Sequence, residues 1–238
     1  MNRQFIQSIS ISWDKISKDS YLRNIESIRS LHTLPVTKPV TFFAGENGSG
    51  KSTLLEAAAI ACGFNPEGGT KNYSFSTYDS HSPLHDALRI SRGVRTPGWG
   101  YFLRAESFYN VASKEEEYAD PLHPSEHFHE KSHGESFLAV AQKQLRPDGL
   151  YFLDEPEAAL SPQRQLTLLL EIYECAKQDS QFFIVTHSPI LLGLPGAEIL
   201  SFDGGKIHPC KYEETDSYQL TEMFINNRKQ LLERLLGE

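Results

Sequence analysis

Nine consecutive residues carry the clearest chemical signal in the sequence, because GENGSGKST satisfies the phosphate-loop pattern G-x-x-x-x-G-K-S. In that loop, backbone N–H groups and a helix N-terminus converge on phosphate oxygens. Lys51 would contact the β- and γ-phosphates, and the Ser52 hydroxyl would bind Mg²⁺. We therefore predict a nucleoside triphosphate site whose residues are Gly45, Glu46, Asn47, Gly48, Ser49, Gly50, Lys51, Ser52 and Thr53.

A triphosphate site also needs a carboxylate for the metal and a group that activates water. The sequence LYFLDEP places Asp154 directly after an apolar run, at the predicted end of a buried strand. Asp154 there can reach Mg²⁺ through a water molecule, and Glu155 follows as the predicted general base.

A third polar side chain follows another apolar run, in FIVTHSP. An imidazole at His187 could hydrogen-bond the γ-phosphate and hold the attacking water against Glu155. The predicted catalytic residues are therefore Glu155, His187 and Lys51.

The elements that must position these residues are strands alternating with helices. We predict strands at 5–13, 39–44, 100–106, 149–153 and 181–186, and a hairpin of 199–202 with 206–210 around Asp203-Gly204-Gly205. We predict helices at 53–62, from about 135 to before Pro147, after the N-cap Ser161 and from about 218. The last two would present apolar faces made of Leu166, Leu169, Leu170 and Tyr173, and of Leu220, Phe224, Leu231 and Leu235.

This alternation predicts an α/β P-loop fold. Its mainly parallel central sheet is flanked by helices, with an antiparallel β portion at the N-terminus and a small helical or irregular lobe. The 238 residues fit one domain, with a core lobe of about 1–62 and 147–238 and a second lobe of about 63–146.

The net charge of −8 disfavours a surface that attracts nucleic acid as a whole. A contact to DNA is thereby limited to a local patch, for which the candidates are Arg89, Arg92, Arg95 and Arg104. No stretch approaches the roughly 18 apolar residues of a membrane span, and the first residues lack the apolar core of a signal peptide. We therefore predict a cytoplasmic protein without a transmembrane segment.

The order of phosphate loop, Ser-His-Gly-Glu-Ser at 132–136, LYFLDEP and a histidine after a further strand resembles the ABC-type ATPases. The resemblance implies ATP as the nucleotide and a head-to-tail homodimer. Ser132, Gly134 and Glu135 would form a signature motif that contacts the γ-phosphate bound to the opposite subunit. Residues 159–161 lie where the family has a dimer-contacting loop.

Several residues depart from the pattern of that family. His133 replaces the first glycine of the signature, and Glu106 stands where a glutamine would begin the lid loop and bind the metal. Trp13 and Tyr21 are both candidates for stacking on adenine. The motif sequences resemble those of stand-alone, RecF-like and SMC-like ATPases more closely than those of transporter subunits. Lys51 and Asp154 are only 103 positions apart, which leaves no room for a long coiled-coil arm.

Other functions remain open from the sequence. The first hypothesis is an ATP-driven dimerisation cycle that a protein partner or effector reads, in a DNA-related or defence-related process. The second is the ATP subunit of a membrane transporter, and the third is a nucleotide-gated module with negligible turnover. Finally, HEKSH at 129–133 matches the H-E-x-x-H pattern of zinc hydrolases.

Overall fold

The computed structural model describes residues 3–70, 82–104 and 133–237, and within the last range it leaves out the side chains of 133–137. Its strands are β1 (Ile6–Ile11), β2 (Thr33–Pro35), β3 (Val40–Ala44), β4 (Leu88–Arg92), β5 (Trp99–Arg104), β6 (Gly149–Asp154), β7 (Gln181–Val185), β8 (Glu198–Ser201) and β9 (His208–Cys210). Its α-helices are α1 (Glu26–Arg29), α2 (Lys51–Ala61), α3 (Leu84–Ala87), α5 (His133–Gln144), α6 (Pro162–Lys177), α7 (Pro189–Leu192) and α8 (Asp216–Leu236).

The central sheet has the strand order β5-β6-β7-β3-β8-β9. All neighbouring pairs from β5 to β8 are parallel, and β9 joins β8 as an antiparallel edge strand. A second sheet, β2-β1-β4, is antiparallel and comes from the N-terminal part of the chain and the strand after α3. The predicted mainly parallel central sheet and the predicted antiparallel β portion at the N-terminus are thereby confirmed.

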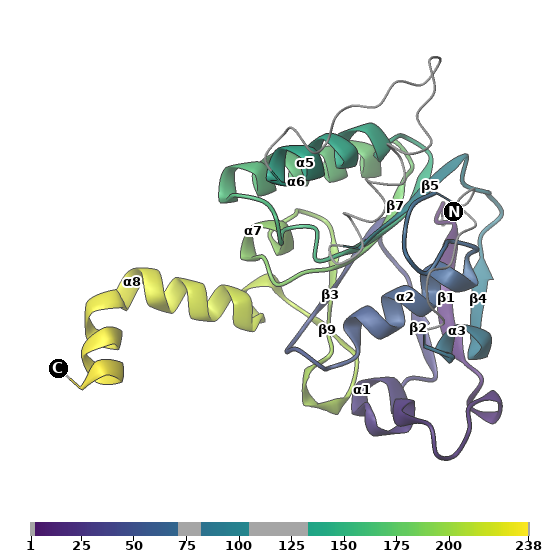
Figure 1. Cartoon of the computed structure of the whole chain (residues 1–238), viewed down its shortest axis with the longest axis horizontal. Helices are drawn as coiled ribbons and strands as arrows, with labels where there is room; N and C mark the ends of the chain where they lie inside the picture. The colour runs from purple at the N-terminus through teal and green to yellow at the C-terminus, as the bar shows by residue number, and fades with distance from the viewer. Residues whose placement is uncertain (1–2, 71–81, 105–132, 238) are drawn as a thin grey trace.

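The central strands are buried on both faces because helices or the second sheet cover each side (Figure 1). Successive side chains of a strand point to opposite faces, and the two cores follow this alternation. Phe43, Phe152 and Phe183 pack toward α2 and the antiparallel sheet. Their sequence neighbours, among them Tyr151 and Phe182, pack toward α5 and α6.

Helix α6 has the predicted N-cap, because the Ser161 hydroxyl accepts a hydrogen bond from the N–H of Arg164 at 3.4 Å. Its predicted apolar face was wrong in part: Leu166 and Leu170 are 52% and 60% exposed. The buried side chains are instead Leu168, Ile172 and Cys175, and Leu169 and Tyr173 flank them. Four leucines between 166 and 170 offer more than one apolar stripe, and packing against the sheet selects the one that continues through Ile172.

The predicted C-terminal helix is confirmed as α8, which extends away from the body of the molecule (Figure 1). No residue of α8 is buried, and Leu220, Phe224 and Leu235 of the expected apolar face are exposed. The helix kinks at Asn227, whose φ of −126° and ψ of 25° are not helical.

Candidate nucleotide-binding site

The candidate site lies at one edge of the central sheet. Strands β6, β7, β3 and β8 are parallel neighbours in this order, so their carboxyl ends meet there. In open α/β sheets, ligands bind at this edge. The phosphate loop follows β3, Asp154 ends β6, His187 follows β7 and Asp203 follows β8.

Two glycines of the phosphate loop are required by its shape. Gly45 has a φ of +134°, and a Cβ there would lie 2.7 Å from Oδ1 of Asp203. Gly50 has a φ of +96°, and a Cβ there would lie 2.8 Å from Ile25 and 2.9 Å from Ile28. Helix α2 begins at the next residue, Lys51, so the loop leads directly into a helix N-terminus, as the sequence predicts.

Lys51 is folded back onto its own loop. Its Nζ donates hydrogen bonds to the carbonyl oxygens of Gly45 at 2.7 Å and Glu46 at 2.6 Å. Burial lowers the pKa of Lys51, and the negative charges of Asp203, Glu155, Asp154 and Glu46 oppose that shift. The ammonium group of Lys51 thus lies in the field of four acidic side chains.

The predicted metal ligands Ser52 and Asp154 are in contact. The Ser52 hydroxyl donates a hydrogen bond to Oδ1 of Asp154 at 2.8 Å. Both offer oxygen, which is the donor that Mg²⁺ prefers. This fits Mg²⁺, which usually binds through one or two protein ligands together with substrate phosphates.

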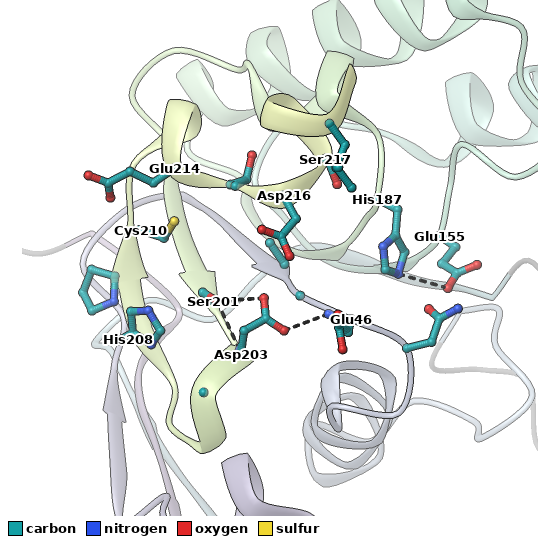
Figure 2. A pocket seen from close by; sticks show the side chains of 17 residues that line it. Glu46, Glu155, His187, Ser201, Asp203, His208, Cys210, Glu214, Asp216 and Ser217 are labelled. Carbon is teal, nitrogen blue, oxygen red and sulfur yellow. Dashed lines mark hydrogen bonds and ion pairs between the residues drawn. The ribbon is translucent and has the colours of Figure 1, made fainter. Parts of the chain in front are cut away.

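Glu155 and His187 face each other across the ends of β6 and β7 (Figure 2). Oε1 of Glu155 lies 4.0 Å from Nε2 of His187. That nitrogen is buried and makes no hydrogen bond to the described residues. The predicted general base and the predicted phosphate-sensing imidazole thus lie together, beside the phosphate loop.

Glu155 adopts a left-handed backbone conformation with a φ of +48°, which costs most L-residues about 1–2 kcal/mol. Asparagine tolerates this region better than other non-glycine residues. We expect Glu155→Asn to raise the free energy of unfolding by about 0.5–1 kcal/mol, and Glu155→Gln to leave it nearly unchanged. Urea denaturation of the two variants measures the difference, and equal stability would show that the backbone at this position is not strained.

Asp203 is a site residue that the sequence analysis missed, because it was assigned only to a hairpin turn. Its carboxylate accepts hydrogen bonds from the N–H of Glu46 at 2.9 Å and from the Ser201 hydroxyl at 3.2 Å (Figure 2). The turn is a short 3-10 helix, Asp203–Gly205, between β8 and β9. The available signal was its place after a strand parallel to β3, since that strand ends at the same edge of the sheet.

A cavity of about 900 Å³ opens beside the loop (Figure 2). Its lining combines the start of the loop, Glu155 and His187 with the hairpin of β8 and β9 and the first turns of α8. Acidic side chains are frequent in this lining and comprise Glu46, Glu155, Asp203, Glu214 and Asp216.

The two candidates for stacking on the base lie in different surroundings. Tyr21 is 52% exposed and lines a second cavity together with Gly48 and Ser49 of the phosphate loop. The indole N–H of Trp13 donates to the carbonyl of Leu31 at 3.2 Å, and the guanidinium of Arg23 lies 5.1 Å from the ring centroid. Only Tyr21 of the two is thus placed in the lining of a cavity at the loop.

Some predicted residues lie outside the described part of the chain. These are Glu106, Ser132 and residues 129–132 of the zinc-hydrolase motif. The last residue of that motif, His133, begins α5, but its side chain is not described. Gly134 and Glu135 lie in the first turn of α5, where the structure describes the backbone but not the Glu135 side chain. Their roles, and the division of the chain into two lobes, stay predictions.

The predicted basic patch is only partly available. Arg95 pairs with Asp148 at 2.6 Å and Asp179 at 3.2 Å, and Arg104 pairs with Glu56 at 3.0 Å. Two of the four arginines therefore form ion pairs within the chain. Arg89 and Arg92 of β4 are exposed and remain candidates for a contact to DNA.

Two family models match the chain. The model described as "AAA domain" matches residues 21–118, and the model described as "AAA domain, putative AbiEii toxin, Type IV TA system" matches residues 135–193. No curated protein matches the sequence. None of the described helices combines the length and apolarity needed to cross a lipid bilayer.

Among similar solved structures are a metal-chelate type ABC transporter in an inward-facing conformation (18% identity, 77% of this chain and 76% of the other, TM-score 0.45) and the SMC head domain from Thermotoga maritima (14% identity, 87% and 100%, TM-score 0.43). An ATP-binding cassette of an ABC transporter is 17% identical over 95% of this chain and 96% of its own, with a TM-score of 0.44. The AAA-domain model at 21–118 spans the phosphate loop between β3 and α2, and the model at 135–193 spans Asp154, Glu155 and His187. Both parts of the candidate site are thus similar to AAA domains.

Proposed function

We propose that the protein binds MgATP at the phosphate loop and hydrolyses it between two copies arranged head to tail. The observation that carries the proposal is the meeting of four groups at one sheet edge. Ser52 and Asp154 are hydrogen-bonded, and Glu155 lies 4.0 Å from His187 beside the loop that holds Lys51.

Each residue then has a defined task in phosphoryl transfer. Lys51 would exchange its two carbonyl partners for the β- and γ-phosphates. Ser52, and Asp154 through a water molecule, would hold Mg²⁺, which when bound would supply positive charge for the phosphate oxygens. Glu155 accepts a proton from the attacking water. His187 hydrogen-bonds the γ-phosphate through Nε2 and keeps the water in line with it.

The acidic cavity beside the loop supports the participation of a second copy. A γ-phosphate facing Glu46, Glu155 and Asp203 would meet carboxylates where it needs hydrogen-bond donors. From the open side, the signature motif of a second copy would supply such donors through the Ser132 hydroxyl and the backbone N–H groups of Gly134 and Glu135. ATP would thus hold two copies together, and hydrolysis would release them.

A composite site makes turnover depend on protein concentration. Phosphate release with MgATP, measured at enzyme concentrations from well below to well above the dimer dissociation constant, tests the proposal. We expect the rate per chain to rise with concentration and then level off. A constant rate per chain over that whole range would show that one copy suffices, and no phosphate release would refute hydrolysis itself.

Tyr21 is proposed as the residue that stacks on adenine, because it lines the cavity at Gly48 and Ser49. Base–aromatic stacking contributes about 1–3 kcal/mol per base. We expect Tyr21→Ala to weaken ATP binding by about 10-fold or more and Tyr21→Phe to retain it, as measured by calorimetric titration. Trp13→Ala is the matched control, because it also removes the aromatic ring, and weaker binding in this variant with normal binding in Tyr21→Ala would assign the stacking to Trp13.

A partner protein or effector would bind one state of this cycle, in which two copies associate with ATP and separate after hydrolysis. The description of the family model at 135–193 favours a defence-related process over a DNA-related one. Purification of the ATP-loaded dimer from its native cells tests this assignment. A co-purifying toxin-like enzyme supports it, whereas a nucleic acid or a membrane permease would point to the other classes.

A further inference from the structure

We propose that Glu157 is a positioning residue that fixes the backbone of His187, and thereby the imidazole, against Glu155. The inference deepens the proposed function and rests on it for the role of the imidazole. Glu157 lies two residues beyond Glu155, in the segment between β6 and α6. Its carboxylate reaches across to the segment after β7, which carries His187.

One oxygen of Glu157 holds two consecutive backbone groups. Oε1 accepts hydrogen bonds from the N–H of His187 at 2.7 Å and from the N–H of Ser188 at 3.1 Å. The sheet pairing of β6 with β7 ends at Asp154 and Val185, and the N–H of Glu155 adds a last bond to the Val185 carbonyl at 2.9 Å. Beyond that point, the Glu157 side chain links the segment after β6 to the segment after β7 through its two hydrogen bonds.

The imidazole depends on this anchor because its own Nε2 makes no hydrogen bond to the described residues. The ring is 4.0 Å from Glu155, so it is placed by the position of the His187 backbone together with packing. Misplacement of a reacting group by about 1 Å can lower a rate by about 100-fold. A side chain that holds the backbone of His187 would therefore affect the chemical step more than ATP binding.

The same segment is braced from its other side. The Ser188 hydroxyl donates to Oε1 of Gln165 at 2.7 Å, and Nε2 of Gln165 donates to the carbonyl of Leu160 at 3.0 Å. Leu160 lies in the segment 159–161, which the resemblance assigns to the dimer contact. Glu157 and Gln165 thus join the segment of His187 to both ends of the loop that follows β6.

The paired variants Glu157→Ala and Glu157→Gln test the proposal, because only glutamine keeps an oxygen that can accept the two N–H groups. We expect Glu157→Ala to lower kcat by about 30-fold with the ATP dissociation constant changed less than about 2-fold. Glu157→Gln should stay within about 3-fold of the parent. Equal losses in both variants, or an unchanged kcat in Glu157→Ala, would overturn the proposal.

Gln181→Ala is a matched control for a purely structural role. Gln181 also bonds two backbone groups, the N–H of Ile6 at 2.8 Å and its carbonyl at 2.9 Å, but at the opposite end of β7. We expect this variant to lower Tm without lowering kcat. A kcat loss in Gln181→Ala as large as that in Glu157→Ala would show that general destabilisation explains both and would overturn the proposal.

Amide hydrogen exchange in the nucleotide-free protein separates this inference from the proposed function. The His187 amide should exchange at least about 10-fold faster in Glu157→Ala than in the parent and in Gln181→Ala. If the parent shows no phosphate release, the proposed function fails while this exchange still decides whether Glu157 anchors the segment. Unchanged protection at His187 would refute the anchor even if ATP is hydrolysed.

Discussion

Glu155→Gln is expected to slow ATP hydrolysis by about 10²–10⁴-fold while ATP still binds. The amide cannot accept a proton from water, but it preserves the size of the side chain that faces His187 at 4.0 Å. Single-turnover phosphate release at saturating MgATP measures the loss, and a nucleotide titration measures the retained affinity. The effect should appear in kcat, because Lys51, Ser52 and Asp154 remain in place.

An exposed glutamate provides the control for this substitution. Glu174 lies on α6 and pairs with Lys177 on the surface, so Glu174→Gln removes one carboxylate without touching the site. This variant should hydrolyse ATP at the parent rate. Hydrolysis by Glu155→Gln within about 3-fold of the parent would assign the general base to another residue.

Lys51→Ala is expected to weaken MgATP binding by about 100-fold or more. The buried ammonium now bonds two carbonyls of its own loop at 2.7 and 2.6 Å, and it can exchange them for two phosphate oxygens. Hydrogen bonds to charged groups contribute about 1.5–3 kcal/mol each, and 1.4 kcal/mol corresponds to a tenfold change in affinity. Fluorescence or calorimetric titration with ATP measures the loss directly.

The loss in Lys51→Ala should not come from unfolding. Thermal unfolding of the nucleotide-free variant checks this, because the alanine also removes the hydrogen bonds to the carbonyls of Gly45 and Glu46, and the affinity is compared only in protein that is still folded. Lys38→Ala, at an exposed lysine, is the control for a general change of charge. Unchanged ATP affinity in folded Lys51→Ala would contradict the assignment of the phosphate loop.

The sheet edge that carries the candidate site could be predicted because its residues follow a local rule. Apolar runs identify the buried strands, and a polar residue directly after such a run lies at a strand end. Parallel strands then bring Asp154, His187 and the loop after β3 together, as the pairing of β6, β7 and β3 confirms. Each of these signals is contained within fewer than ten residues of sequence.

Features that depend on packing between distant segments could not be predicted in this way. The buried stripe of α6 was wrong because several leucines satisfy helical spacing and only the sheet selects among them. The role of Asp203 requires the turn after β8 to approach Glu46, which lies 157 residues earlier in the chain. The choice of Tyr21 over Trp13 depends on which side chain lines a cavity at the loop.

Light scattering of the Glu155→Gln variant tests the central claim most directly, because slow hydrolysis should trap the ATP-bound state. With saturating MgATP we predict a species of twice the 26.9 kDa chain mass, and without nucleotide a species of the single chain mass. Lys51→Ala under the same conditions should keep the single mass. An ATP-saturated Glu155→Gln variant that stays at the mass of one chain would contradict the composite site.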